Sequence, residues 1–140
     1  EIASCLVGSE MCIRDRYVTI PTLGNSSSFG DLTSLTSYTS GASNSVRGIY
    51  AGNGATPQTT IESINISSTG NGVKFGDLFS GKYAMAAVSS PTRVVWGGGD
   101  GYTDMIQYVN IATEGAAADF GNLTSGRAFQ SGCSNAHGGL

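Results

Sequence analysis

The sequence predicts an all-β fold of stacked, four-stranded antiparallel sheets, the architecture of a β-propeller. The motif Phe-Gly-Asp-Leu begins at Phe29 and Phe75 and returns as Phe-Gly-Asn-Leu at Phe120, after 46 and then 45 residues. Repetition at a period near 45 is typical of propeller blades or helical repeats. No apolar stripe of helical period extends over ten residues, and Gly and β-branched residues are frequent, so helical repeats are excluded.

Each repeat is expected to contain four strands. Turn signals at 99–102 and 114–115 separate runs of β-forming residues. Apolar residues occupy both faces of the second and third runs, which indicates a sheet packed between two others. In the last complete repeat the expected strands cover 81–89, 92–98, 104–113 and 118–123.

Several positions recur in every repeat and are therefore expected to be structural, because a catalytic residue is normally needed only once. The three phenylalanines are interpreted as core between the sheets, each burying about 150–250 Å². The acidic or amide residue two positions later is expected to cap the turn after the fourth strand. An arginine opens the second strand in the two complete repeats, whereas the last copy has His137 followed by two glycines where this run is expected. These positions are Phe29, Phe75, Phe120, Asp31, Asp77, Asn122, Arg47 and Arg93.

The first sixteen residues do not follow the repeat. Asp15 falls where Ile61 and Ile106 supply an apolar residue. The segment 5–16, back-translated, resembles a translated sequencing adapter, which implies a non-native read-through joined to a fragment from an environmental (metagenomic) assembly. A signal peptide is the alternative, but charged residues interrupt its apolar run. We therefore expect residues 1–16 to be loosely attached and to contribute no core packing.

The remaining chain, 17–140, is expected to be one β-propeller repeat region. Propellers close with about 4 to 8 blades, so the chain is expected to belong to a larger propeller or to associate with itself. Its partners would then be the missing blades of the same protein or further copies. The expected layout is a half blade at 17–32, complete blades at 37–78 and 82–123, and a partial blade at 127–140.

Composition argues against several functions. Lys and Arg total 7 against 10 Asp and Glu, a net charge of −3 without a basic run, so no nucleic-acid partner is expected. No segment approaches the roughly 18–20 apolar residues of a membrane helix, so no membrane insertion is expected. Cys133 and His137 lack the further ligands of a zinc site. Asp100 and Asp104 flank a glycine turn and could bind Ca²⁺, but turn formation is their ordinary role.

No catalytic constellation stands out. The chain has one His, and neither a Ser-His-Asp set nor a carboxylate pair can be proposed with any geometry. We therefore expect no enzyme activity, no cofactor and no metal.

The connections between the second and third strands differ between repeats, which favours them as binding loops on a rigid scaffold. Tyr102 is a candidate for stacking on a sugar; filling a gap between sheets is the alternative. The candidate binding residues are Asn53, Thr56, Gln58, Asp100, Tyr102 and Asp104.

Residues 108–113 and 119–123 resemble the tandem "YVTIxTxGNxxDFGDL" repeats of phage virion and tail-fibre-like proteins. The order of elements also resembles a divergent kelch repeat. The first two copies depart from the motif, with Ser28 and Lys74 in place of the acidic residue before Phe. The resemblance implies a non-enzymatic structural or binding module of a virion appendage that recognises a cell-surface glycan or protein, located in the virion.

Two other functions are compatible with the same repeats. One is a cellular kelch-like protein-interaction domain, and the other is a non-catalytic part of a carbohydrate-active propeller enzyme. Fold alone does not decide among them.

Overall fold

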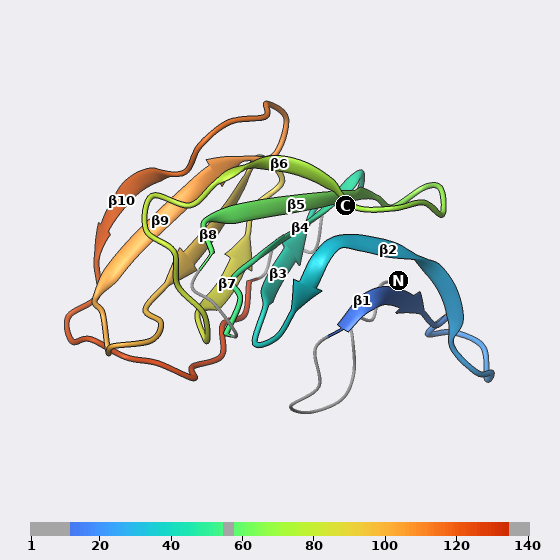
Figure 1. The fold of residues 1–140 in the computed structure, drawn as a ribbon, viewed down its shortest axis with the longest axis horizontal. Helices are drawn as coiled ribbons and strands as arrows, with labels where there is room; N and C mark the ends of the chain where they lie inside the picture. Colours follow the sequence, from blue (N-terminus) through green and yellow to red (C-terminus); the bar gives the residue numbers. More distant parts are fainter. Residues whose placement is uncertain (1–11, 55–57, 135–140) are drawn as a thin grey trace.

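The computed structural model describes residues 12–54 and 58–134 of the chain. Three antiparallel sheets follow one another across the molecule, with β7–β10 at the left, β3–β6 in the middle and β1–β2 at the right of Figure 1; one sheet has two strands and two have four. Within this described part there is no helix, and hence none long and apolar enough to cross a membrane. The strands are β1 (Cys12–Tyr17), β2 (Ser27–Thr36), β3 (Ser40–Ser43), β4 (Arg47–Ala51), β5 (Thr60–Asn65), β6 (Val73–Asp77), β7 (Ala86–Ser89), β8 (Arg93–Gly97), β9 (Met105–Asn110) and β10 (Ala118–Asn122).

The all-β prediction is confirmed, and both four-stranded sheets lie inside the ranges expected for complete repeats. Their strands are shorter than predicted at the ends. β9 stops at Asn110 because the Asn110 side chain accepts a hydrogen bond from the Ala112 amide, 3.0 Å away, and forms a local turn. β7 begins only at Ala86. The segment 127–134, expected to start a partial blade, contains no strand.

The pairing between the third and fourth strands is the same in all three repeats. Gly30 pairs with Asp15, Gly76 with Ile61 and Gly121 with Ile106. A register irregularity lies next to each of these pairs. The alignment of Asp15 with the two isoleucines is therefore confirmed.

Residues 12–16 differ from the expectation of loose attachment, because they form β1 and pair with β2. Strand pairing uses backbone groups that every non-proline residue carries, so β2 can pair with a segment of unsuitable side chains. β1 ends at Tyr17, and Ile20 just beyond it is exposed.

The main core lies between the two four-stranded sheets. A second cluster of Phe29, Tyr50 and Ile64, with Tyr17 beside it, joins β1–β2 to the sheet β3–β6. The middle sheet is thus covered on both faces, as its apolar pattern predicts. The main core comprises Ile49, Ala51, Ile61, Phe75, Leu78, Met85, Val94, Trp96, Val109, Ile111 and Ala117.

The prediction that all three motif phenylalanines are buried is wrong for Phe120. Phe75 is 3 % exposed, whereas Phe120 is 54 % exposed. Phe75 is covered by the next sheet along the chain, but no described sheet lies beyond β7–β10 (Figure 1). The burial of this residue is therefore a property of the neighbouring repeat.

Asp15 occupies the position of an isoleucine in the other repeats and is 5 % exposed. Its Oδ2 atom has no hydrogen-bond partner. Burial, and then the negative charges of Glu62 and Asp31, raise the pKa of Asp15. The pKa of Asp15 in the folded protein thus lies above its unfolded value of about 3.9. The free energy of unfolding therefore falls as the pH rises from the unfolded pKa to the folded pKa, and above the folded pKa the buried charge destabilises the protein fully.

Asp15→Ile should therefore stabilise the protein by about 1–3 kcal/mol at pH 7. The gain should shrink as the pH is lowered towards 4, because protonation removes the charge penalty from the wild-type chain. Urea unfolding at both pH values measures the difference. A gain of equal size at pH 4 and pH 7 would show that the buried charge is not its source.

Candidate functional site

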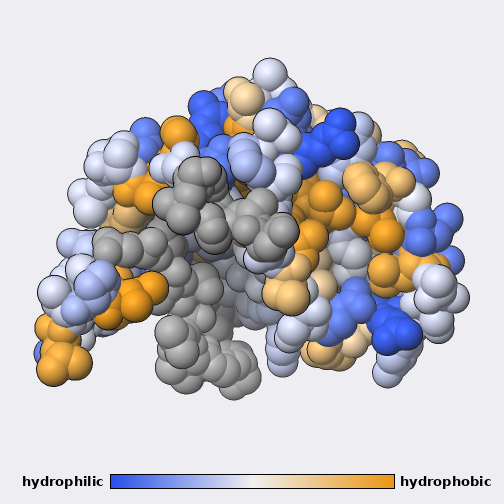
Figure 2. All heavy atoms as spheres, turned by 180° about the vertical axis from the view of Figure 1, so that it is seen from behind, coloured by the Kyte–Doolittle hydropathy of each residue, from blue (hydrophilic) through white to orange (hydrophobic). Residues whose placement is uncertain are grey.

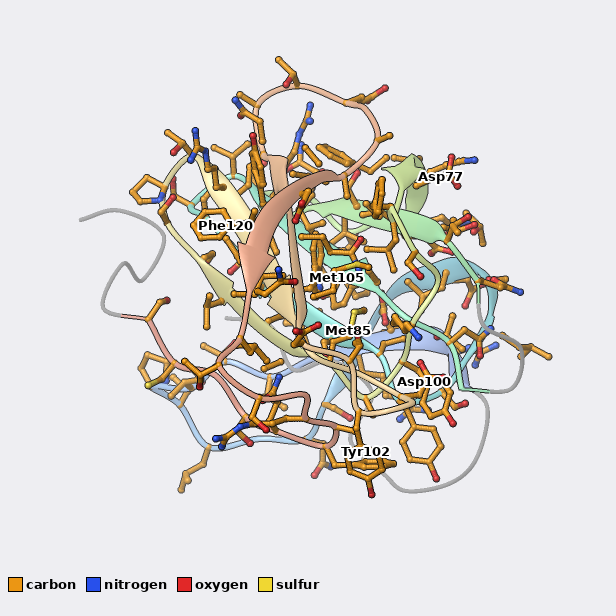
Figure 3. All side chains as sticks on the ribbon, turned by 90° about the vertical axis from the view of Figure 1, so that its left-hand side faces the viewer. Asp77, Met85, Asp100, Tyr102, Met105 and Phe120 are labelled. Atoms are coloured by element: carbon orange, nitrogen blue, oxygen red, sulfur yellow. The ribbon has the colours of Figure 1, made fainter. Side chains whose placement is uncertain are left out.

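Two sets of loops meet at one end of the sheets, which we call the loop end. It contains the β4–β5 and β8–β9 connections and the linkers that join one sheet to the next. Backbone hydrogen bonds connect the two sets: the Gly54 amide donates to the Ser37 carbonyl at 2.9 Å, and the Asp100 amide to the Tyr83 carbonyl at 3.0 Å. Figure 3 shows Asp100 and Tyr102 close together at this end.

Three linkers are joined to each other at equivalent positions. Tyr38, Ala84 and Phe129 have φ values of 54°, 53° and 55°, in the left-handed region. The Ala84 amide donates to the Tyr38 carbonyl at 3.2 Å, and the Phe129 amide to the Ala84 carbonyl at 3.0 Å. Bulky residues rarely adopt this conformation, which costs about 1–3 kcal/mol and is retained where surrounding contacts fix it.

The same linkers form an aromatic cluster, defined here as Tyr38, Tyr83 and Phe129. The Tyr38 ring lies 6.0 Å from that of Tyr83 and meets the Phe129 ring edge-on at 6.2 Å and 85°. In the series of equivalent linker positions, the middle one is occupied by Ala84, which has a small side chain. Because Tyr38 is 54 % and Phe129 70 % exposed, the cluster presents apolar ring surface to solvent at a place fixed by the backbone.

A charged pair adjoins the aromatic cluster. Lys82 Nζ lies 4.0 Å from Asp100 Oδ1 and donates to the Asp100 carbonyl at 3.3 Å. The Tyr83 amide also donates to Asp100 Oδ1, at 3.4 Å. Asp100 thus holds its turn against the linker that carries Tyr83. Among the described residues, no group of three or more His, Cys, Asp or Glu is placed to hold a metal ion.

The other predicted loop residues do not form one common site. Asn53 is buried, and its Nδ2 donates to the Leu35 carbonyl at 3.0 Å. With Gln58 it lines a shallow depression between β2 and the middle sheet. Tyr102 is exposed with a φ of 53°, and Asp104 contributes a backbone carbonyl to the Leu123 amide. Thr56 and His137 lie outside the described residues.

Each of the two repeated arginines lies over an aromatic ring. Arg47 lies over the Phe75 ring at 6.0 Å and donates to the Ile111 carbonyl at 3.3 Å. Arg93 lies 4.9 Å from the centre of the Tyr108 ring. The structural role that the repetition predicted for both arginines stays a prediction.

The side chain of Asp77 contacts strand neighbours and not the turn that follows it. It pairs with Lys74 at 2.9 Å and accepts from Thr59 at 3.2 Å, and the hydrogen bond from Lys74 lowers the pKa of Asp77. Asp31 pairs with Arg14 at 3.7 Å. The equivalent Asn122 is exposed.

Sequence reasoning missed two sets of residues. Tyr38 and Phe129 stand at aligned positions, two repeats apart, and both are aromatic. Glu62 and Gln107 are also aligned, and both are buried polar residues on third strands. In each case the signal was available in the alignment of the repeats, as a shared residue type outside the main motif.

The fold and the loop end define a repetitive all-β protein in which three successive antiparallel sheets present connected loops at one end. In comparisons with known proteins, no protein-family model matches the chain, and no curated protein matches it.

Proposed function

We propose that this chain is a non-enzymatic binding module, a segment of a kelch-like β-propeller whose stacked sheets hold a recognition surface at the loop end. The observation that carries the proposal is the aromatic cluster. It combines exposed rings with linker backbones held in an unfavourable conformation by mutual hydrogen bonds. Strain of this kind is concentrated at ligand-binding sites, and loops on a rigid scaffold are the usual carriers of binding.

The chemistry of the loop end suits a carbohydrate or a protein surface. Exposed rings can pack against the apolar face of a sugar, and the adjoining Lys82–Asp100 pair offers charged donors and acceptors for hydroxyl groups. The resemblance to phage virion repeats supports a tail-fibre-like receptor-binding role. The proposed ligand is thus a cell-surface glycan or a protein, bound without metal or cofactor.

Tyr38→Ala and Phe129→Ala should each weaken binding about tenfold or more, because exposed aromatic anchors dominate many interfaces. A glycan array identifies the ligand, and calorimetric titration of each variant gives its Kd. Val46→Ala is the matched control, since Val46 is as exposed as Tyr38 but lies in the β3–β4 turn at the opposite end. Binding that survives both aromatic substitutions would place the recognition surface elsewhere.

A further inference from the structure

The outer face of the sheet β7–β10 carries apolar side chains that no other described sheet covers. We call it the open face and define it by Val95, Ile106, Tyr108 and Phe120. It is turned towards the viewer in Figure 3, and Figure 2 shows apolar residues on the side of the molecule where these strands lie. We propose that the open face docks one partner, a further antiparallel sheet of the same repeat.

The first argument is that the equivalent face is covered elsewhere in the molecule. Ile61 and Phe75, which correspond to Ile106 and Phe120, are 0 % and 3 % exposed under the next sheet. The first repeat shows the same relation for aromatic pairs. Tyr17 meets Phe29 edge-on at 6.1 Å and 84°, beneath Tyr50 and Ile64 of the middle sheet.

The open face carries the same edge-on aromatic pair, but no described sheet covers it. Tyr108 meets Phe120 edge-on at 5.8 Å and 79°, and Phe120 is mostly exposed. The phenylalanine of this pair is therefore buried beneath the middle sheet at Phe29 and mostly exposed on the open face at Phe120.

The second argument comes from backbone hydrogen bonds between sheets. The Gly70 amide donates to the Phe29 carbonyl at 2.9 Å, and the Gly115 amide to the Phe75 carbonyl at 3.1 Å. The carbonyl of Phe120 is next in this series. The docked sheet should therefore bring a loop of small residues, like the loops that contain Gly70 and Gly115, against the end of β10.

The third argument specifies a polar residue on the partner. Glu62 Oε2 accepts from the Thr33 amide at 3.1 Å, and Gln107 Oε1 accepts from the Phe79 amide at 2.8 Å. Glu62 thus binds the preceding sheet within β2, and Gln107 binds the segment just after β6. Thr124 is next in this series. The partner sheet should accordingly carry Glu or Gln on its third strand.

The partner also needs a large aromatic residue on its second strand. Tyr50 lies in the cluster under β1–β2, and Trp96 lies in the core between the two larger sheets. A second copy of this chain does not offer an uncovered sheet face that has both an aromatic residue on its second strand and Glu or Gln on its third strand. In the described part of the chain, the face with Tyr50 and Glu62 and the face with Trp96 and Gln107 are already covered.

The last described residues already lie where the first strand of such a sheet would be expected. Gln130 Nε2 donates to the Gly97 carbonyl at 2.7 Å, and a Cβ atom on Gly132 would lie 2.6 Å from Val88 Cγ1. β3 lies against β7 in the same manner, where Ser89 Oγ donates to the Ser43 carbonyl at 2.8 Å. Residues 130–132 therefore run beside β7 at the position of a first strand.

The test lengthens the chain by one repeat. A copy of residues 90–123 is placed directly after Ser134, in place of residues 135–140, which preserves the 45-residue register. In the lengthened chain, Phe120→Ala should lower the Tm by roughly 10 °C, because the ring is then buried. In the chain as it exists, the same substitution should lower the Tm by no more than about 5 °C.

Hydrogen exchange provides a second readout. The Thr124 amide should exchange on the order of a hundredfold more slowly in the lengthened chain. That protection should be lost when Ala replaces the glutamine copied from Gln107. An unprotected Thr124 amide, together with a Phe120→Ala effect that stays as small as in the original chain, would overturn the proposal.

The chain as it exists gives an independent check. Sedimentation should show no dimer that depends on Phe120. A dimer that Phe120→Ala abolishes would make a second copy the occupant and would also overturn the proposal. Neither result bears on the loop end, whose ligand binding is measured separately.

Discussion

Phe75→Ala is expected to lower the free energy of unfolding by about 3–5 kcal/mol, since a buried Phe truncated to Ala loses its transfer free energy and leaves a cavity. Phe75 is 3 % exposed and belongs to the core between the two larger sheets. The guanidinium of Arg47 lies over its ring, so the substitution also removes a cation–π contact. Because small domains are stable by about 5–15 kcal/mol, such a loss brings the protein close to unfolding.

Phe120→Ala is the matched control, because the residue occupies the same place in the motif but is mostly exposed. We expect it to cost about 1 kcal/mol or less, chiefly through loss of the edge-on contact with Tyr108. Urea unfolding of the two variants gives both values. Equal costs for the two substitutions would contradict the assignment of the core to the space between the sheets.

The contrast between these two residues shows what the sequence predicts well. Strand order, pairing and register follow from local signals: turn residues, alternation, and the Phe-Gly motif, which recurs with the same pairing of Gly30, Gly76 and Gly121. Burial does not follow in this way, because a side chain on a sheet face is covered only if another sheet arrives. Copying the environment of Phe75 onto Phe120 failed for this reason.

The loop end was predictable only in part. Variation between the connections pointed to Asp100 and Tyr102, and both lie at the loop end. The aromatic cluster depends on left-handed backbone at Tyr38 and Phe129, a conformation that their residue types disfavour. Propensity therefore argues against this geometry, and hydrogen bonds between linkers more than forty residues apart produce it.

The glycine of the repeat motif has its own explanation in the contact between sheets. A Cβ atom on Gly76 would lie 1.8 Å from the carbonyl oxygen of Gly115, and one on Gly30 would lie 2.1 Å from that of Gly70. In each case the obstructing atom belongs to the backbone of the following repeat and cannot rotate away. The absence of a side chain at this glycine thus lets a loop of the next sheet pack directly against the backbone of the motif.

Gly76→Ala should therefore destabilise the protein by about 3 kcal/mol or more, which combines overpacking with the weakening of nearby hydrogen bonds. The bonds at risk are those from the Gly115 amide to Phe75 and from the Ala117 amide to Asp77, at 3.1 and 2.7 Å. Urea unfolding measures the loss of stability. Faster exchange of the two amides would locate the damage between the sheets.

Gly70→Ala is the control for this substitution. A Cβ atom there would meet nothing within 4 Å, and the residue is not in the left-handed region. Its amide, which donates to the Phe29 carbonyl, is kept in alanine, so we expect a change within about 0.5 kcal/mol. If Gly76→Ala proved as harmless as Gly70→Ala, the sheets would not approach each other through this motif. The contact between the two larger sheets would then depend on the side chains of Phe75 and Leu78 in this motif.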